Sequence, residues 1–122
     1  MGLVEGRHTM IVLVGWIDID PARRAEVLTA SEPLQRGTRD DEPGCLAYVF
    51  AADPLREGRI AVHEAWSAPE SLQAHFAHAN YRGMLELLGS ADIRGMDVAK
   101  HDVKQSAPVY RPDGVPDATW WG

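Results

Sequence analysis

The 122-residue sequence predicts a single α+β domain, in which four antiparallel strands form a split βαβ sheet with helices on one face. Two observations predict this fold class. Strand-like and helix-like segments follow one another in the order βαββαβ, and only a short loop separates the two middle strands. Hydrophobic residues make up 45% of the chain and charged residues 25%, which is typical of a globular domain with its own core.

The first strand is expected over residues 9–19, where β-branched residues are frequent. Its two alternating faces are both apolar, and consist of Met10, Val12, Val14 and Trp16 on one side and of Ile11, Leu13, Ile17 and Ile19 on the other. A strand with this composition is usually buried on both faces. We therefore expect helices to cover one face of the sheet and a second copy of the chain to cover the other.

The first helical segment is expected to begin at Asp20-Pro21, with Asp20 as the N-cap and Pro21 in the first turn. The stripe expected to be buried consists of Ala22, Ala25 and Leu28. Pro33 is expected to break or kink this helix, because proline lacks the backbone N–H and clashes with the preceding turn. A second helical piece would then run to about residue 41.

Residues 45–52 and 59–66 are expected to form the second and third strands, paired antiparallel across a loop at 53–58. Side chains alternate along a strand, so Glu64 and Trp66 should share one face while His63 points to the other.

The next helix is expected to start with a capping box at Ser67 to Glu70. Its buried face is expected to hold Leu72, His75, Phe76 and Ala79. Asn80 is expected to cap a short last helix over residues 81–88, which Gly89 ends. A fourth strand should run from residue 93 to about residue 106.

Three regions follow from these elements. Residues 1–8 are short and polar and are expected to be a disordered or non-native start, residues 9–106 form the domain, and residues 107–122 form a tail rich in proline and glycine. The tail ends near Trp120 and Trp121, and large exposed aromatic side chains of this kind favour interfaces. We expect the tail to pack on a dimer partner; the alternative is a disordered end.

The net charge of −6 disfavours nucleic acid and anionic membranes as partners, because both bind clustered basic residues. No apolar run approaches the length of a membrane span, and no signal peptide is recognised. A single cysteine, Cys45, excludes an internal disulfide and a cysteine-based zinc site. It fits a reducing compartment, and a cytoplasmic location is expected.

The stretch Glu42-Pro43-Gly44-Cys45, the strand end Glu64-Ala65-Trp66 and the histidine nine residues later, His75, resemble the pattern of the antibiotic biosynthesis monooxygenase (ABM) family. Asn80-Tyr81-Arg82 extends the resemblance, which covers roughly residues 9–106. The resemblance implies a ferredoxin-like domain, a dimeric α/β barrel and an apolar cavity between each sheet and its helices. It also implies a quinol-monooxygenase-like activity, since members include cofactor-free oxygenases that act on quinols or polyketide phenols.

The main candidate residues for chemistry are Glu64, Trp66 and His75. A half-buried histidine beside a carboxylate is suited to general base catalysis. His75 is therefore the candidate base, Glu64 its orienting partner and Trp66 an aromatic wall for a flat substrate. The alternative is a structural role, in which Glu64 and His75 are a paired polar contact between helix and sheet and Trp66 belongs to the core.

Four further residues are candidates for substrate binding, namely Tyr48, Phe76, Tyr81 and Arg82. Tyr48 shares a strand face with apolar neighbours, so a core role is the alternative for it. Arg82 would suit a substrate oxyanion, although an arginine on a helix surface is more often solvated.

No metal is expected, because His63 should face away from Glu64 and His75 even though His75 and His78 are close in sequence. Haem-degrading relatives have an Asn on the first strand, and residues 10–19 contain none. Nucleotide-binding motifs are absent as well. The sequence therefore predicts a homodimeric, cofactor-independent monooxygenase acting on a small aromatic molecule. The alternatives are a non-catalytic binding protein, a haem-degrading enzyme or an isomerase.

Overall fold

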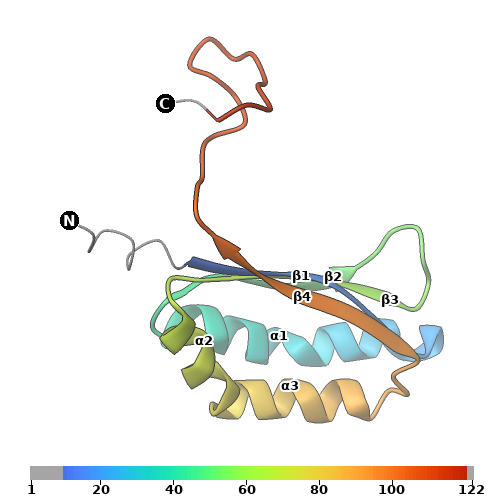
Figure 1. Ribbon diagram of the computed structural model, residues 1–122. Coiled ribbons are helices and arrows are strands. Elements are labelled where there is room, and N and C mark those ends of the chain that lie inside the picture. Colours follow the sequence, from blue (N-terminus) through green and yellow to red (C-terminus); the bar gives the residue numbers. More distant parts are fainter. Residues whose placement is uncertain (1–9, 121–122) are drawn as a thin grey trace.

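The computed structural model describes residues 10–120, which contain one four-stranded sheet. Its strands are β1 (Met10–Asp18), β2 (Cys45–Ala52), β3 (Arg59–Trp66) and β4 (Gly95–Val103). Their order in the sheet is β2-β3-β1-β4, and every neighbouring pair is antiparallel (Figure 1). This is the predicted split βαβ sheet.

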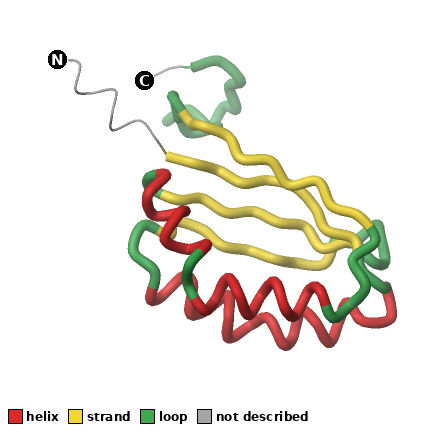
Figure 2. The backbone as a smooth tube through the Cα atoms, turned by 60° about the horizontal axis from the view of Figure 1, so that its bottom comes forward, coloured by secondary structure: helices red, strands yellow, loops and turns green. Residues whose placement is uncertain are grey.

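The helices cover one face of the sheet (Figures 1 and 2). A short 3-10 turn, η2 (Pro21–Arg23), leads into α1 (Arg24–Asp41), and α2 (Pro69–Phe76) and α3 (Ala79–Gly89) follow β3. The packed core lies between these helices and the sheet. Its buried side chains include Ile17, Ile60 and Val62 from the strands and Val27, Leu72, Met84 and Leu88 from the helices.

The other face of the sheet is apolar but carries no helix (Figure 1). On β1 this face presents Val12, Val14 and Trp16, and Val14 pairs with His63 across the β1–β3 register. Val14 is 48% exposed, whereas Ile11 and Ile17 on the opposite face are buried. The prediction that helices cover one face of β1 is confirmed, and the second cover stays a prediction.

Helix α1 runs continuously through Pro33, so the predicted break is wrong. The buried stripe is also different from the predicted one, because Ala22 and Ala25 are exposed. The residues that α1 buries are Val27, Ser31 and Thr38. The two hydroxyl groups bond to carbonyl groups of their own helix, at Leu28 and Leu34, and this allows polar side chains to face the core.

The helix starts differ from the sequence in two of three cases. Asp20 caps η2 as predicted, since its side chain accepts a hydrogen bond from the Ala22 N–H. The capping box at Ser67 is wrong, because the N-cap of α2 is Ala68 and no side chain bonds there. His78 caps α3 in place of Asn80, whose side chain is engaged elsewhere.

The free edge of β2 is covered by two side chains of α1. The Gln35 amide both donates to the Phe50 carbonyl and accepts from the Phe50 N–H, each at 3.0 Å. One helical turn later, the Arg39 guanidinium donates to the Tyr48 carbonyl at 2.8 Å. These bonds satisfy an edge strand that would otherwise be open to pairing with another chain.

Residues 104–120 project beyond the sheet on the side away from the helices (Figure 1). They form a turn closed by the Tyr110–Pro116 bridge, with Gly114 at φ 85°. The predictions for residues 1–8 and for Trp121 lie outside the described residues. Within residues 10–120, no helix is long and apolar enough to cross a membrane.

Candidate active site

His75 is the centre of the candidate site. It lies on α2, is 1% exposed and is enclosed by aromatic rings. The distances from its ring centroid to those of its neighbours are 4.7 Å to Trp66, 5.3 Å to Tyr48, 5.4 Å to Tyr81 and 6.2 Å to Phe76. The β3 strand end and the two short helices therefore bring four of the predicted residues together around the histidine.

The carboxylate beside His75 belongs to Glu42 and not to Glu64. Nδ1 of His75 lies 2.7 Å from Oε1 of Glu42, which is itself 7% exposed. Glu64 instead accepts a hydrogen bond from Nε1 of Trp66 at 3.0 Å. The predicted Glu64–His75 pair is thus wrong, because the indole two residues along the same strand takes the Glu64 carboxylate. Glu42 was missed as a site residue, although the Glu-Pro-Gly-Cys stretch pointed to it.

Nε2 of His75 is buried and makes no hydrogen bond within residues 10–120. A buried polar atom without a partner is uncommon in folded proteins and calls for an explanation. Since Nδ1 is occupied by Glu42, Nε2 is the ring atom left to accept a proton or a hydrogen bond from a small molecule.

Burial raises the pKa of Glu64, the hydrogen bond from Trp66 opposes this shift, and the negative charge of Glu42 adds to it. Burial also raises the pKa of the Tyr48 phenol far above its usual range, with further contributions from Glu64 and Glu42. Tyr48 consequently stays neutral at physiological pH. It supplies an aromatic surface rather than a proton-transfer group.

An apolar groove of about 530 Å³ opens beside this cluster, between α2 and the strands β1 and β4. It is lined by Ile11, Pro69, Leu72, Gln73, Phe76, Lys100 and Asp102. Phe76 belongs to both features, because it lines the groove and packs against Tyr81 at 5.1 Å. The groove thus reaches the outer side of the aromatic cluster around His75.

The remaining candidates lie apart from this centre. Arg82 is exposed and donates to the Ala77 carbonyl, so its guanidinium takes no part in the cluster. His63 is exposed on the open face of the sheet, as the strand alternation predicted. Among residues 10–120, no three His, Cys, Asp or Glu side chains are grouped in a way that would hold a metal ion.

The fold and the site together define a ferredoxin-like α+β domain with an apolar groove beside a buried histidine. A model of the ABM family, described as antibiotic biosynthesis monooxygenase, matches residues 10–87, more than half of the chain. The chain therefore belongs to the antibiotic biosynthesis monooxygenase family. No curated protein matches the chain.

Several solved structures share the fold. A Caulobacter crescentus protein proposed to be an antibiotic biosynthesis monooxygenase is 23% identical, with a TM-score of 0.72, over 80% of this chain and 92% of that one. A further antibiotic biosynthesis monooxygenase is 25% identical, with a TM-score of 0.67, over 80% and 99%. Rv0793 from Mycobacterium tuberculosis is 17% identical, with a TM-score of 0.66, over 85% and 99%.

Proposed function

We propose that the protein is a cofactor-independent monooxygenase that oxidises a small phenolic or quinol-type aromatic molecule with O₂. The observation that carries this proposal is the buried, unpartnered Nε2 of His75 among four aromatic side chains. A base in an aromatic surrounding suits a flat, acidic substrate, and family membership supports the reaction class.

The reaction begins when the substrate hydroxyl loses its proton to Nε2 of His75. The resulting electron-rich anion passes an electron to O₂, and a bond then forms between a ring carbon and oxygen. When the O–O bond breaks, one oxygen atom stays on the product as a carbonyl and the other leaves as water with the two hydrogens lost by the substrate. The four electrons needed to reduce O₂ all come from the substrate.

The aromatic side chains have two roles in this scheme. Trp66 and Tyr48 form walls for the ring and keep water away from the reactive intermediate. Phe76 is 40% exposed and stands between the groove and His75, so its side chain must move for a substrate to reach Nε2.

Haem does not fit the site equally well. β1 has no Asn, and His75 is held by Glu42 on one ring nitrogen and surrounded by aromatic rings on the rest. A porphyrin would require several of these side chains to leave the core, whereas a single aromatic ring requires the displacement of Phe76 alone. We therefore derive no step through haem.

Oxygen uptake tests the proposal. Chelator-treated protein is offered hydroquinones and hydroxylated naphthalenes, as wild type and as His75→Ala. We expect protein-dependent uptake that falls by roughly 10²-fold or more in the variant, the usual size of a general-base contribution. His101→Ala, which removes an exposed histidine from β4, should keep the wild-type rate. Absence of uptake across the panel would instead favour a non-catalytic binding protein.

We further propose that the open sheet face packs against a second copy of the chain. Val14 on β1 and Val49 on β2 are 48% and 36% exposed, and Trp16 lies on the same face. The tail extends on this side of the sheet, where Val109 and Trp120 are more than half exposed. These apolar residues would be covered if two sheets met face to face and each tail lay against the partner.

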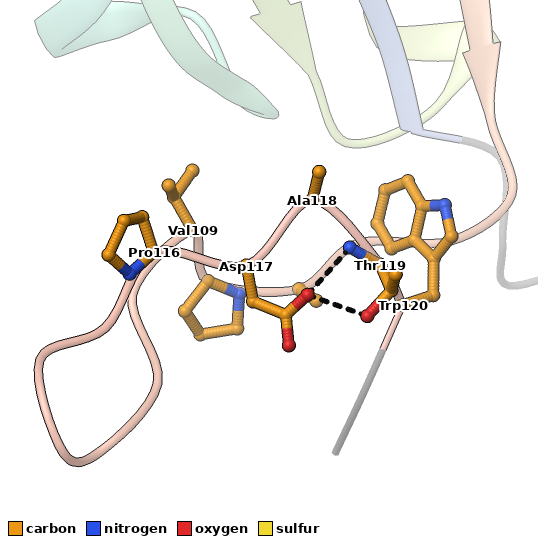
Figure 3. A pocket seen from close by; sticks show the side chains of 8 residues that line it. Val109, Pro116, Asp117, Ala118, Thr119 and Trp120 are labelled. Carbon is orange, nitrogen blue, oxygen red and sulfur yellow. Dashed lines mark hydrogen bonds between the residues drawn. The ribbon is translucent and has the colours of Figure 1, made fainter.

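Figure 3 shows how the tail is built for such a contact. Val109 and Ala118 point to one side of the segment, while the Asp117 carboxylate accepts hydrogen bonds from the Thr119 N–H and hydroxyl. An apolar hollow of about 500 Å³ lies between Val109, Pro116 and Trp120. The tail has internal hydrogen bonds of its own, so it presents this apolar side as an ordered surface.

Sedimentation equilibrium tests the dimer. Val14→Glu places a charge on the open face and should weaken dimerisation by about tenfold or more. Deletion of residues 107–122 should also weaken it. Leu55→Glu is the matched control, because Leu55 is 90% exposed in the loop between β2 and β3. Unchanged dimer affinity in the Val14 variant would rule out the face, and unchanged affinity after the deletion would rule out the tail contact.

A further inference from the structure

The Glu42 carboxylate is satisfied at both oxygen atoms. Oε1 lies 2.7 Å from Nδ1 of His75, Oε2 accepts a hydrogen bond from Nδ2 of Asn80 at 3.0 Å, and Nδ1 of His78 is 3.6 Å from Oε2. An ionised carboxylate can only accept hydrogen bonds. The contact with His75 therefore places the ring proton on Nδ1 and leaves the lone pair on Nε2.

The position of Glu42 is set by a tight turn. Glu42 ends α1, and the Cys45 N–H bonds back to the Glu42 carbonyl at 3.3 Å with Gly44 at φ 85°. Proline at the second position and a left-handed glycine at the third are typical of a type II turn. The Glu-Pro-Gly-Cys stretch thus closes a turn that directs the Glu42 side chain toward α2.

The same turn packs directly against the start of α2. The Gly44 carbonyl accepts the Ser67 N–H at 2.8 Å. A Cβ atom at Gly44 would lie 2.1 Å from Oγ of Ser71, so only glycine allows this approach. Since His75 lies one turn beyond Ser71 on α2, the turn fixes the separation between the carboxylate and the imidazole.

We infer that Glu42 is the positioning residue of the site: it holds His75 in the Nδ1–H tautomer, so that Nε2 is the base, and it stabilises the imidazolium formed when Nε2 takes a proton. The second half of this inference rests on the proposed function, whereas the tautomer does not. When the proton arrives at Nε2, an N–H bond forms there, and the positive charge on the ring faces the Glu42 carboxylate at 2.7 Å. In a hydrogen-bonded pair of this kind the carboxylate orients the base without itself taking the proton.

The tautomer is measured first, by ¹⁵N NMR of histidine-labelled wild-type protein. We expect His75 to be neutral with the proton on Nδ1. A ring protonated on Nε2 would overturn the inference, and this measurement requires neither a variant nor turnover. Glu64→Gln is the matched control, because Glu64 is buried beside Trp66 but does not bond to His75. It should leave the His75 tautomer unchanged.

Glu42→Gln is the second arm. Glutamine offers both a donor and an acceptor to Nδ1, so we expect the Nε2–H tautomer to become populated. We expect kcat to fall by roughly 10²-fold or more with KM changed less, the range for a disabled general base. Glu42→Asp should restore part of the loss. A glutamine variant with the wild-type tautomer and wild-type kcat would overturn the inference. If wild-type protein shows the Nδ1–H tautomer but no oxygen uptake, only the proposed function fails.

Discussion

Gly15→Ala is expected to lower the free energy of unfolding by about 3 kcal/mol, at the upper end of the range for overpacked cores. A Cβ atom at this position of β1 would lie 1.9 Å from the Asp97 carbonyl oxygen and 2.6 Å from Cα of Val98, both on β4. These are backbone atoms, so no side-chain rotation relieves the clash, and β4 must move away from β1. Urea unfolding followed by circular dichroism measures the loss.

Gly89→Ala is the matched control for this prediction. A Cβ atom at Gly89, the last residue of α3, meets nothing within 4 Å, so alanine there should leave stability unchanged or raise it slightly. A Gly15 variant as stable as the Gly89 variant would contradict the close approach of β4 to β1. Since Ile11, Lys100 and Asp102 of these two strands line the groove, a displaced β4 should also change its width.

The strands were predictable because their signals are local. β2 and β3 have the bounds that the sequence predicted, since an apolar run on each side of a short polar loop specifies a hairpin almost by itself. β4 was predicted over a wider range, 93–106, than the observed Gly95–Val103. Its weak apolar pattern reflects its place, because β4 packs beside β1 and no helix covers it to any extent.

The errors in the helices have a common physical reason, which is that tertiary contacts outweigh local preferences. Pro33 costs α1 one backbone hydrogen bond, yet Gln35 and Arg39 bond to β2 on the far side of it and hold the helix in one piece. At the start of α2, the Ser67 N–H bonds to the Gly44 carbonyl, so the cap position shifts to Ala68.

The candidate site was predictable in part for the same reason. Trp66 and His75 are nine residues apart on a strand and the helix that folds back over it, so their proximity follows from the element order. Glu42 is 33 residues from His75, and the contact depends on where α1 ends relative to α2. Spacing along the chain carries no signal for such a pair. The Pro-Gly turn indicates a specific backbone path but not its partner.

Trp66→Phe is expected to destabilise the protein by about 3 kcal/mol at neutral pH and by much less near pH 4. Nε1 of Trp66 is the donor to the buried Glu64 carboxylate, and a hydrogen bond to a charged group contributes roughly 1.5–3 kcal/mol, to which the lost ring contacts add. Phenylalanine leaves that carboxylate without its partner in the core. Near pH 4 the carboxyl is protonated, so the loss of the donor matters less.

The direction of this pH dependence follows from the pKa of Glu64. Burial raises that pKa in the folded state, and the Trp66 hydrogen bond limits the rise. The folded protein therefore retains a proton that the unfolded chain has lost, and stability falls as pH increases from the ordinary glutamate pKa through the raised value. Without Trp66 the pKa rises further, so the fall with pH becomes steeper. Thermal unfolding at several pH values measures it.

Glu64→Gln reverses the effect. The amide keeps an acceptor oxygen for Nε1 of Trp66 but carries no charge, so this variant should be more stable than wild type at neutral pH, by about 1.4 kcal/mol for each unit by which the pKa is raised. In the double variant with Trp66→Phe, the pH-dependent part of the loss should disappear and the packing loss remain. If the Trp66 variant is equally destabilised at pH 4 and pH 7, the cost is packing alone and the buried carboxylate makes no contribution.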